Sequence, residues 1–140
     1  MNKLTIIQRH QQDVTILDLV GNVKMGEDVV NLRQALRILI TEGEKKILLN
    51  LAGISLIDSS GLGELVAGYI SLQKIGGELK LLNLTTRVSE LMMITKLLTV
   101  FDSFEDEGEA INSFQISPKN NDSKQSDIET AKLEATAVGL

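Results

Sequence analysis

The sequence has 140 residues, of which 43% are hydrophobic and 3% aromatic; it contains no cysteine and carries a formal net charge of -5. This length is enough for one domain with its own core and too short for two ordinary domains. The acidic balance argues against a nucleic-acid partner, because binding a phosphate backbone needs clustered Lys and Arg. Without cysteine there is no disulfide, thiolate metal site or cysteine nucleophile.

The apolar segments are too short to cross a membrane. The opening segment, MNKLTIIQRH, lacks the long apolar core of a secretory signal. The most apolar stretch, ILLNLAGISLI at 47–57, is interrupted by Asn50 and is much shorter than the roughly 20 residues that a membrane helix needs. We therefore expect a cytoplasmic protein with no membrane partner.

Two β-prone runs open the chain and predict an antiparallel hairpin. They are KLTIIQ at 3–8 and VTILDLV at 14–20, and the polar segment RHQQD between them is typical of a turn. His10, the only histidine, falls in that polar turn. Gly21-Asn22 is expected to end the second strand.

A helix and a buried strand are predicted next. From Glu27 onward, apolar residues recur at steps of three and four, the period of an amphipathic helix, and Gly43 is expected to end it. KKILLNL at 45–51 is an apolar run bounded by charge on one side and by Gly53 on the other. Such runs are typical of strands buried on both faces, so we expect this strand at the centre of the sheet.

The second half of the chain continues the alternation of helix and strand. A helix is predicted over 61–74, with Gly76-Gly77 as its left-handed end, and a strand follows at 78–84. Thr85 or Thr86 is expected to cap a third helix.

The end of the chain predicts a last strand, a last helix and a tail. LTVF at 98–101 has the pattern of a short strand, and Ser103 with Asp106 matches the signature of a helix start. Beyond residue 116 the sequence contains the only proline and few large apolar side chains. We therefore expect a domain at 1–116 and a disordered tail at 117–140.

The predicted order defines an α/β fold. Strands that alternate with helices are joined by right-handed crossovers, so we expect a mixed, mostly parallel sheet of about five strands with about four helices. In such sheets, ligand and partner contacts gather at loops beyond the carboxyl ends of the strands. One of these loops is LIDSSGLGEL at 56–65, which carries an acid, two adjacent serines and two glycines.

The sequence around this loop does not favour catalysis. A hydrolytic serine needs a base and a group that orients the base, and His10 is the only histidine. The Gly-x-Ser-x-Gly motif and the glycine patterns of nucleotide-binding loops are absent. The carboxylates are scattered or lie in the acidic run at 102–109. We expect no catalytic residue, no cofactor and no metal.

Helix capping explains only part of the loop. Asp58, Ser59 and Ser60 are all favourable N-cap residues, but one capping side chain is sufficient. A further hydroxyl at an exposed helix start is suited to phosphorylation, because an added charge of about -1.5 to -2 would lie beside the positive helix end and change the surface that a partner meets. Local physics does not choose between Ser59 and Ser60 as the acceptor.

Residues 47–101 resemble the STAS domain of bacterial anti-sigma factor antagonists. The resemblance is carried by Asp58-Ser59-Ser60-Gly61-Leu62-Gly63 after an apolar strand and by Gly76-Gly77-Glu78-Leu79 before the next strand. A more diffuse similarity covers about 3–114. The resemblance implies the STAS fold and a partner-binding site at 58–63.

The same resemblance implies a switch. The unphosphorylated protein would bind an anti-sigma factor that is itself an ATP-dependent serine kinase, and so release a sigma factor. The kinase would phosphorylate Ser59, and a metal-dependent PP2C-type phosphatase would remove the phosphate. Asp58 would position the acceptor, Ser60 would cap the helix, and Gly61 and Gly63 would allow a close backbone approach, although packing of the helix on the sheet could need the same glycines.

The chain departs from the family pattern at Gly21-Asn22-Val23-Lys24, where many relatives have an acidic Gly-Glu-Leu/Ile-Asp. This segment is near the expected partner surface, so the identity of the kinase is left open. STAS domains also serve as constitutive scaffolds and as transporter-associated subunits. These two roles are the alternatives to a phosphorylation-switched binding protein.

Overall fold

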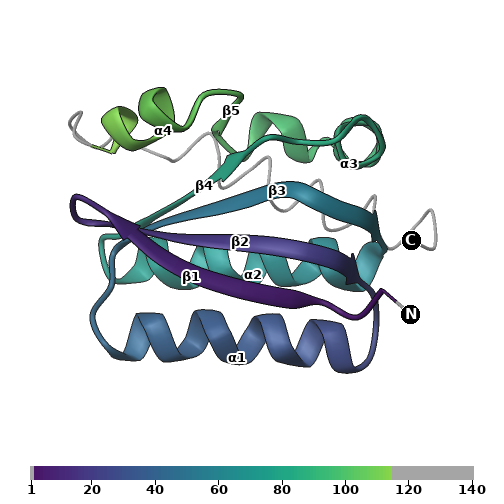
Figure 1. The fold of residues 1–140 in the computed structure, drawn as a ribbon, viewed down its shortest axis with the longest axis horizontal. Helices are drawn as coiled ribbons and strands as arrows, with labels where there is room; N and C mark the ends of the chain where they lie inside the picture. The colour runs from purple at the N-terminus through teal and green to yellow at the C-terminus, as the bar shows by residue number, and fades with distance from the viewer. Residues whose placement is uncertain (1, 115–140) are drawn as a thin grey trace.

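The computed structural model describes residues 2–114, which contain five strands, four α-helices and one short 3-10 helix (Figure 1). The predicted fold class is confirmed, whereas the predicted tail at 117–140 lies outside the described residues. The elements are β1 (Thr5–Gln11), β2 (Val14–Val23), α1 (Glu27–Thr41), β3 (Lys46–Ile57), α2 (Ser59–Lys74), β4 (Glu78–Leu82), α3 (Thr86–Ile94), η1 (Leu97–Thr99), β5 (Ser103–Phe104) and α4 (Glu107–Ser113).

The strands form one mixed sheet in the order β1-β2-β3-β4-β5. β1 is antiparallel to β2, and every other neighbouring pair is parallel. The register of β2 on β3 begins with Thr15 opposite Ile47 and ends with Val23 opposite Ile57. The carboxyl ends of these two strands therefore lie side by side at one edge of the sheet.

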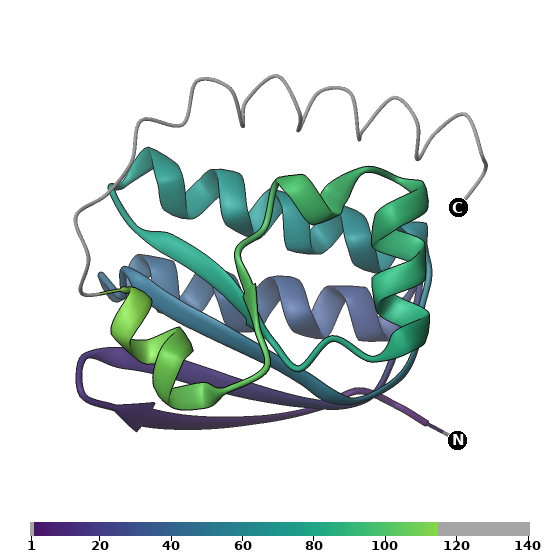
Figure 2. The same ribbon diagram turned by 90° about the horizontal axis from the view of Figure 1, so that it is seen from above.

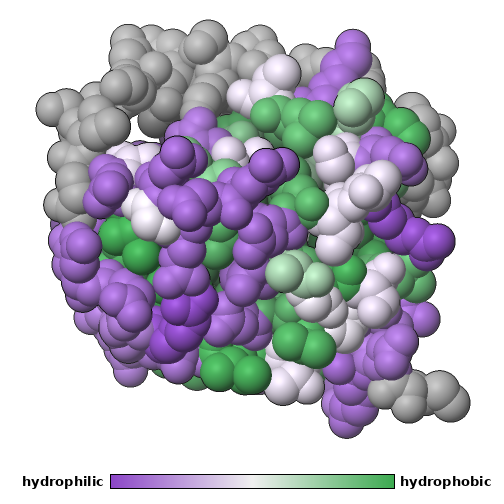
Figure 3. All heavy atoms as spheres, turned by 45° about the horizontal axis from the view of Figure 1, so that its top comes forward, coloured by the Kyte–Doolittle hydropathy of each residue, from purple (hydrophilic) through white to green (hydrophobic). Residues whose placement is uncertain are grey.

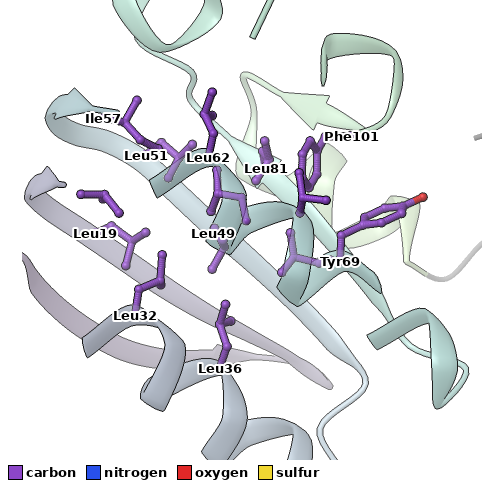
Figure 4. Close-up of a cluster of buried hydrophobic side chains, with 14 of the residues drawn as sticks. Leu19, Leu32, Leu36, Leu49, Leu51, Ile57, Leu62, Tyr69, Leu81 and Phe101 are labelled. Carbon is purple, nitrogen blue, oxygen red and sulfur yellow. The ribbon is translucent and has the colours of Figure 1, made fainter. Parts of the chain in front are cut away.

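The sheet has a hydrophobic cluster on each face. α1 and α2 cover one face and α4 lies on the other (Figures 1 and 2). In the larger cluster, Leu32 and Leu36 of α1 pack with Leu49 of β3 (Figure 4). The neighbouring Leu48 belongs to the smaller cluster, with Phe114 of α4. Successive residues of a strand point to opposite faces, which explains the continuous apolar run and confirms that β3 is buried on both sides.

The helix ends predicted from glycine and threonine are confirmed. Gly76 has a φ of 77°, and the N–H of Gly77 donates to the carbonyl of Leu72 at 2.7 Å, as in a Schellman motif. At the start of α3, the hydroxyl of Thr85 accepts a hydrogen bond from the N–H of Val88 at 3.2 Å. Short-range backbone chemistry decides these positions, so they could be recognised from the sequence.

Both central strands are longer than predicted. β2 continues through Gly21-Asn22, and β3 continues from 51 to Ile57. A Cβ on Gly53 would lie 2.9 Å from Cγ2 of Val20, beside an irregularity in the β2–β3 register. The predictions were wrong because a glycine in a strand can mark a close backbone approach at a bulge rather than the end of the strand.

The predicted strand at 98–101 is also wrong. Leu97–Thr99 forms the 3-10 helix, and the last strand is Ser103–Phe104, beside β4. A short apolar run has no periodicity that distinguishes a strand from a buried turn of helix. Ser103 is therefore not part of a helix start; Asp106 alone caps α4, accepting a hydrogen bond from the N–H of Glu109 at 2.9 Å.

Candidate functional site

The two serines lie at the edge of the sheet where β2 and β3 end. Val23 and Ile57 are the last residues paired between those strands, so the loop after β2 lies beside the start of α2. α2 begins at Ser59, two residues earlier than predicted. α3 is found at this same end of the domain in both views (Figures 1 and 2). The site is thus built from segments that are far apart in the sequence.

Asp58 holds this site together through both carboxylate oxygens. Its Oδ1 accepts a hydrogen bond from the N–H of Gly61 at 2.9 Å, which caps α2. Its Oδ2 accepts one from the N–H of Met25, also at 2.9 Å. Its own N–H donates to the carbonyl of Val23 at 3.3 Å. Asp58 therefore caps the helix and attaches it to the loop after β2.

Ser59 and Ser60 are the first two residues of α2, and both are half-buried. Neither hydroxyl makes a hydrogen bond within residues 2–114. The prediction that Ser60 caps the helix is wrong. A cap residue needs a non-helical backbone, which Asp58 has, with φ -108° and ψ -174°, whereas Ser60 is already helical. Both hydroxyls are consequently left for chemistry or contacts outside the domain.

The three residues after the serines have different roles. A Cβ on Gly61 would lie 2.3 Å from the carbonyl oxygen of Val23, so packing of α2 against β2 requires a glycine there. Leu62 is 1% exposed and belongs to the larger cluster. Gly63 is exposed, and a Cβ there would meet nothing within 4 Å. Of these three residues, only Gly63 is exposed.

The surface at this end of the domain is apolar and partly basic. Met25 in the loop after β2 is 76% exposed, and Met93 and Ile94 in the last turn of α3 are 62% and 59% exposed. Lys24 is exposed and makes no ion pair within residues 2–114. Hydrophobic patches lie among hydrophilic side chains on the face drawn in Figure 3. Of these four residues, only Lys24 was indicated by the sequence, as part of the segment near the expected partner surface; Met25, Met93 and Ile94 were not.

Part of the surface around the serines could have been predicted from the sequence. Parallel strands bring their carboxyl ends to one edge of a sheet, so the segment after each strand is a candidate neighbour of the serines. That rule selects Lys24 and Met25 after β2. It does not select Met93 or Ile94, because their positions depend on how α3 packs on the domain.

His10 lies too far from the serines to act as their base. It is in β1 rather than in the predicted turn, opposite Thr15, which in turn pairs with Ile47 of β3. Ile47 precedes Ile57 by ten residues, or roughly 30 Å along the strand at about 3.3 Å per residue. The prediction of a turn was wrong because the polar segment RHQQD continues β1 through Gln11.

The remaining features do not place other chemistry at the serines. Within residues 2–114 no group of three or more His, Asp or Glu could hold a metal ion. In the same part of the chain, no helix combines the length and the apolar character needed to cross a membrane. A pocket of about 400 Å³ lies between α1 and α2, where Arg33 binds Glu64 at 3.1 Å, but its lining does not include either serine.

These observations define a class of protein, a small α/β binding module with its candidate contact surface at the carboxyl edge of a mixed sheet. The family model of the STAS domain matches residues 5–110, and the chain belongs to this family. The resemblance inferred from the serine loop is thereby confirmed.

Individual relatives agree with this assignment. The chain is 32% identical over 102 residues to the anti-sigma-B factor antagonist of Bacillus subtilis strain 168, a match that covers 73% of this chain and 91% of the relative. It is similar in fold to an anti-sigma factor antagonist from Thermotoga maritima, with a TM-score of 0.71, 23% identity, and coverage of 79% of this chain and 95% of that one. It also resembles the Bacillus cell fate determinant SpoIIAA in its phosphorylated form, with a TM-score of 0.63, 22% identity, and coverage of 78% and 98%.

Proposed function

We propose that this chain is a regulatory binding protein whose affinity for its partner is switched by phosphorylation of Ser59. The observation that carries the proposal is the environment of the Ser59 hydroxyl. This hydroxyl makes no hydrogen bond within residues 2–114, while Asp58 beside it is held by hydrogen bonds with Val23, Met25 and Gly61. A phosphoryl group at Ser59 would change the surface of the domain without removing a contact that stabilises the fold.

The proposed partner is an anti-sigma factor that is also a serine kinase. Sequestering it with the unphosphorylated chain would release a sigma factor, and a PP2C-type phosphatase would restore the unphosphorylated form. Two relatives support this proposal: one is described as an anti-sigma-B factor antagonist, and SpoIIAA has been solved in a phosphorylated form. The module would bind rather than catalyse, and its cytoplasmic location stays a prediction.

Ser59 is the proposed acceptor by resemblance, and the neighbours of the two serines on the helix surface give this choice weak support. Residues four apart on a helix are neighbours on its surface. A phosphate on Ser60 would lie one turn from the carboxylate of Glu64, whereas a phosphate on Ser59 would lie one turn from Gly63, which has no side chain. Like charges at this spacing are destabilising. Because Arg33 already pairs with Glu64 at 3.1 Å, this repulsion is reduced, and it favours Ser59 only slightly.

The size of the switch follows from the charge added to the interface. A phosphoryl group brings about -1.5 to -2 charges at neutral pH. Like charges that meet across an interface cost several kcal/mol, and each 1.4 kcal/mol is a tenfold change in affinity. We expect phosphorylation to weaken partner binding by about 100-fold or more.

Fragmentation mass spectrometry of the protein from its native cells, combined with capture of partners, tests the proposal. We expect phosphate on Ser59 in a fraction that changes with growth conditions, and a kinase that co-purifies with the unmodified form. Ser59→Ala should bind that kinase under all conditions, and Ser59→Asp should bind it weakly. Ser60→Ala is the matched control and should keep the switch.

A different result would replace the switch with one of the alternative roles. If Ser59 stays unmodified and one partner is retained in every condition by wild type, Ser59→Ala and Ser59→Asp alike, the chain acts as a constitutive scaffold or transporter-associated subunit. Covalent labelling of Ser59 by a serine-directed reagent would instead indicate catalysis.

A further inference from the structure

The loop after β2 places Lys24 next to the start of α2. Its two neighbours in the chain both bind the residue that precedes the proposed phosphate acceptor: the carbonyl of Val23 accepts from the N–H of Asp58 at 3.3 Å, and the N–H of Met25 donates to Oδ2 of Asp58 at 2.9 Å. The N–H of Lys24 itself points to Oδ2 of Asp28, at 3.4 Å. The backbone of Lys24 is therefore positioned from both helices that begin at this edge.

The packing of α2 also brings its first turn against the end of β2. A Cβ on Gly61 would lie 2.3 Å from the carbonyl oxygen of Val23, so the first turn of α2 and the end of β2 are in van der Waals contact. Lys24 follows Val23 directly, and Ser59 precedes Gly61 by two residues. A flexible four-carbon stem gives the ammonium group of a lysine a wide reach from such a position.

The charge of Lys24 has no partner within residues 2–114, in contrast to other charges at this edge. Lys3 pairs with Glu27 at 2.7 Å. The carboxylate of Asp58 already accepts two backbone hydrogen bonds. Arg87, in the first turn of α3, is another exposed cation on an element found at this end. A dianion on α2 would therefore meet an unpaired lysine on the adjacent loop.

We propose that Lys24 is the intramolecular counter-ion of a phosphoryl group on Ser59, so that phosphorylation ties the loop after β2 to the start of α2. This inference rests on the proposed function, because it concerns the phosphorylated form. In the unmodified protein, Lys24 is a free cation beside the exposed Met25, suited to an acidic group on the partner. In the phosphorylated protein, Lys24 forms an ion pair with the phosphate and is no longer free to bind the partner. The modification would remove a positive contact as well as add negative charge.

The test is a titration of the phosphate by phosphorus NMR, on full-length protein with phosphoserine incorporated at position 59 during synthesis. A nearby cation favours the dianion and lowers the second pKa of the phosphate. Lys24→Gln should therefore raise this pKa by about 0.2 to 0.7 unit, the range that corresponds to an exposed ion pair. Circular dichroism would verify that the variant is folded.

Two further variants test whether the change in the phosphate pKa is specific to Lys24. Lys45→Gln makes the same change of charge at an exposed lysine before β3, at the opposite end of the sheet, and should leave the titration unchanged. The proposal is overturned if Lys24→Gln titrates like wild type, or if Arg87→Gln produces the shift instead. Because the phosphoserine is installed directly, this outcome is independent of whether a kinase modifies Ser59 in the cell, which is what tests the proposed function.

Discussion

The carboxylate of Asp58 accepts a hydrogen bond from the backbone N–H of Met25, 33 residues earlier in the chain, at 2.9 Å. Because the other oxygen of the same carboxylate caps α2, one side chain joins two segments that are only brought together by the pairing of β2 with β3. The start of α2 and the loop after β2 therefore behave as one unit around the candidate acceptor.

Two substitutions at Asp58 separate these contacts. Asp58→Ala removes both acceptors and should destabilise the domain by about 1 to 3 kcal/mol. Asp58→Asn should cost less, because Asn is an equally good N-cap, but its amide NH₂ cannot accept from Met25. In hydrogen exchange, the Met25 amide should lose protection in both variants and the Gly61 amide only in Asp58→Ala. Unchanged exchange at Met25 in both would contradict the joining role of Asp58.

Alanine at the two glycines of the site should have opposite effects on stability. Gly61→Ala forces a Cβ against the carbonyl of Val23 and should cost about 1 to 3 kcal/mol. Gly63→Ala fills open space on an exposed helical turn and should stabilise by about 0.5 to 1 kcal/mol. Urea unfolding measures both. Equal destabilisation by the two variants would show that the position of Gly63 is not open.

The ion pairs of Arg9 should make stability depend on acidic pH. Arg9 binds Asp18 at 2.7 Å and Glu107 at 2.6 Å, linking β1 and β2 to α4. Its hydrogen bonds lower the pKa of both carboxyl groups below their ordinary values. A depressed pKa contributes stability above the unfolded pKa and loses it as the pH falls through the folded pKa.

Arg9→Met is the variant that tests this dependence. Its loss of stability relative to wild type should be about 1 kcal/mol or less at neutral pH, as expected for partly exposed pairs, and should shrink towards about pH 3. Urea unfolding across that range gives the comparison. A difference that stays constant with pH would assign the effect of Arg9 to packing instead of charge.

The single tyrosine reports on the packing of α2. The ring of Tyr69 contacts the ring of Phe101 edge to face, with centroids 5.3 Å apart. Burial raises the pKa of its phenol, with a smaller contribution from the negative charges of Asp102 and Glu78. Titration followed by tyrosinate absorbance should give a midpoint above about 10 in the folded protein and near 10 in urea. Phe101→Ala should bring the folded midpoint closer to the unfolded one.

The sequence by itself determined the order of elements and the place of the site. Periodicity predicted α1 and the buried run of β3, and glycine predicted the end of α2, because these features depend on residues within one or two turns of each other. The motif at 58–63 and its position after a central strand indicated the STAS family for the same reason: it is a contiguous stretch with its own local pattern. Chain length was sufficient to predict one domain with its own core, but not that this core forms a separate cluster on each face of the sheet.

Only the tertiary structure decided which residues share the site and what each one does there. Three capping candidates stood in a row, and backbone geometry selected Asp58 as the cap. The sequence does not distinguish Gly61 from Gly63, but the proximity of β2 leaves no room for a side chain at Gly61, whereas Gly63 faces open space. The loop that carries Lys24 lies beside the start of α2 because of the pairing of β2 with β3. Such contacts join segments distant in sequence, and no local period or propensity encodes them.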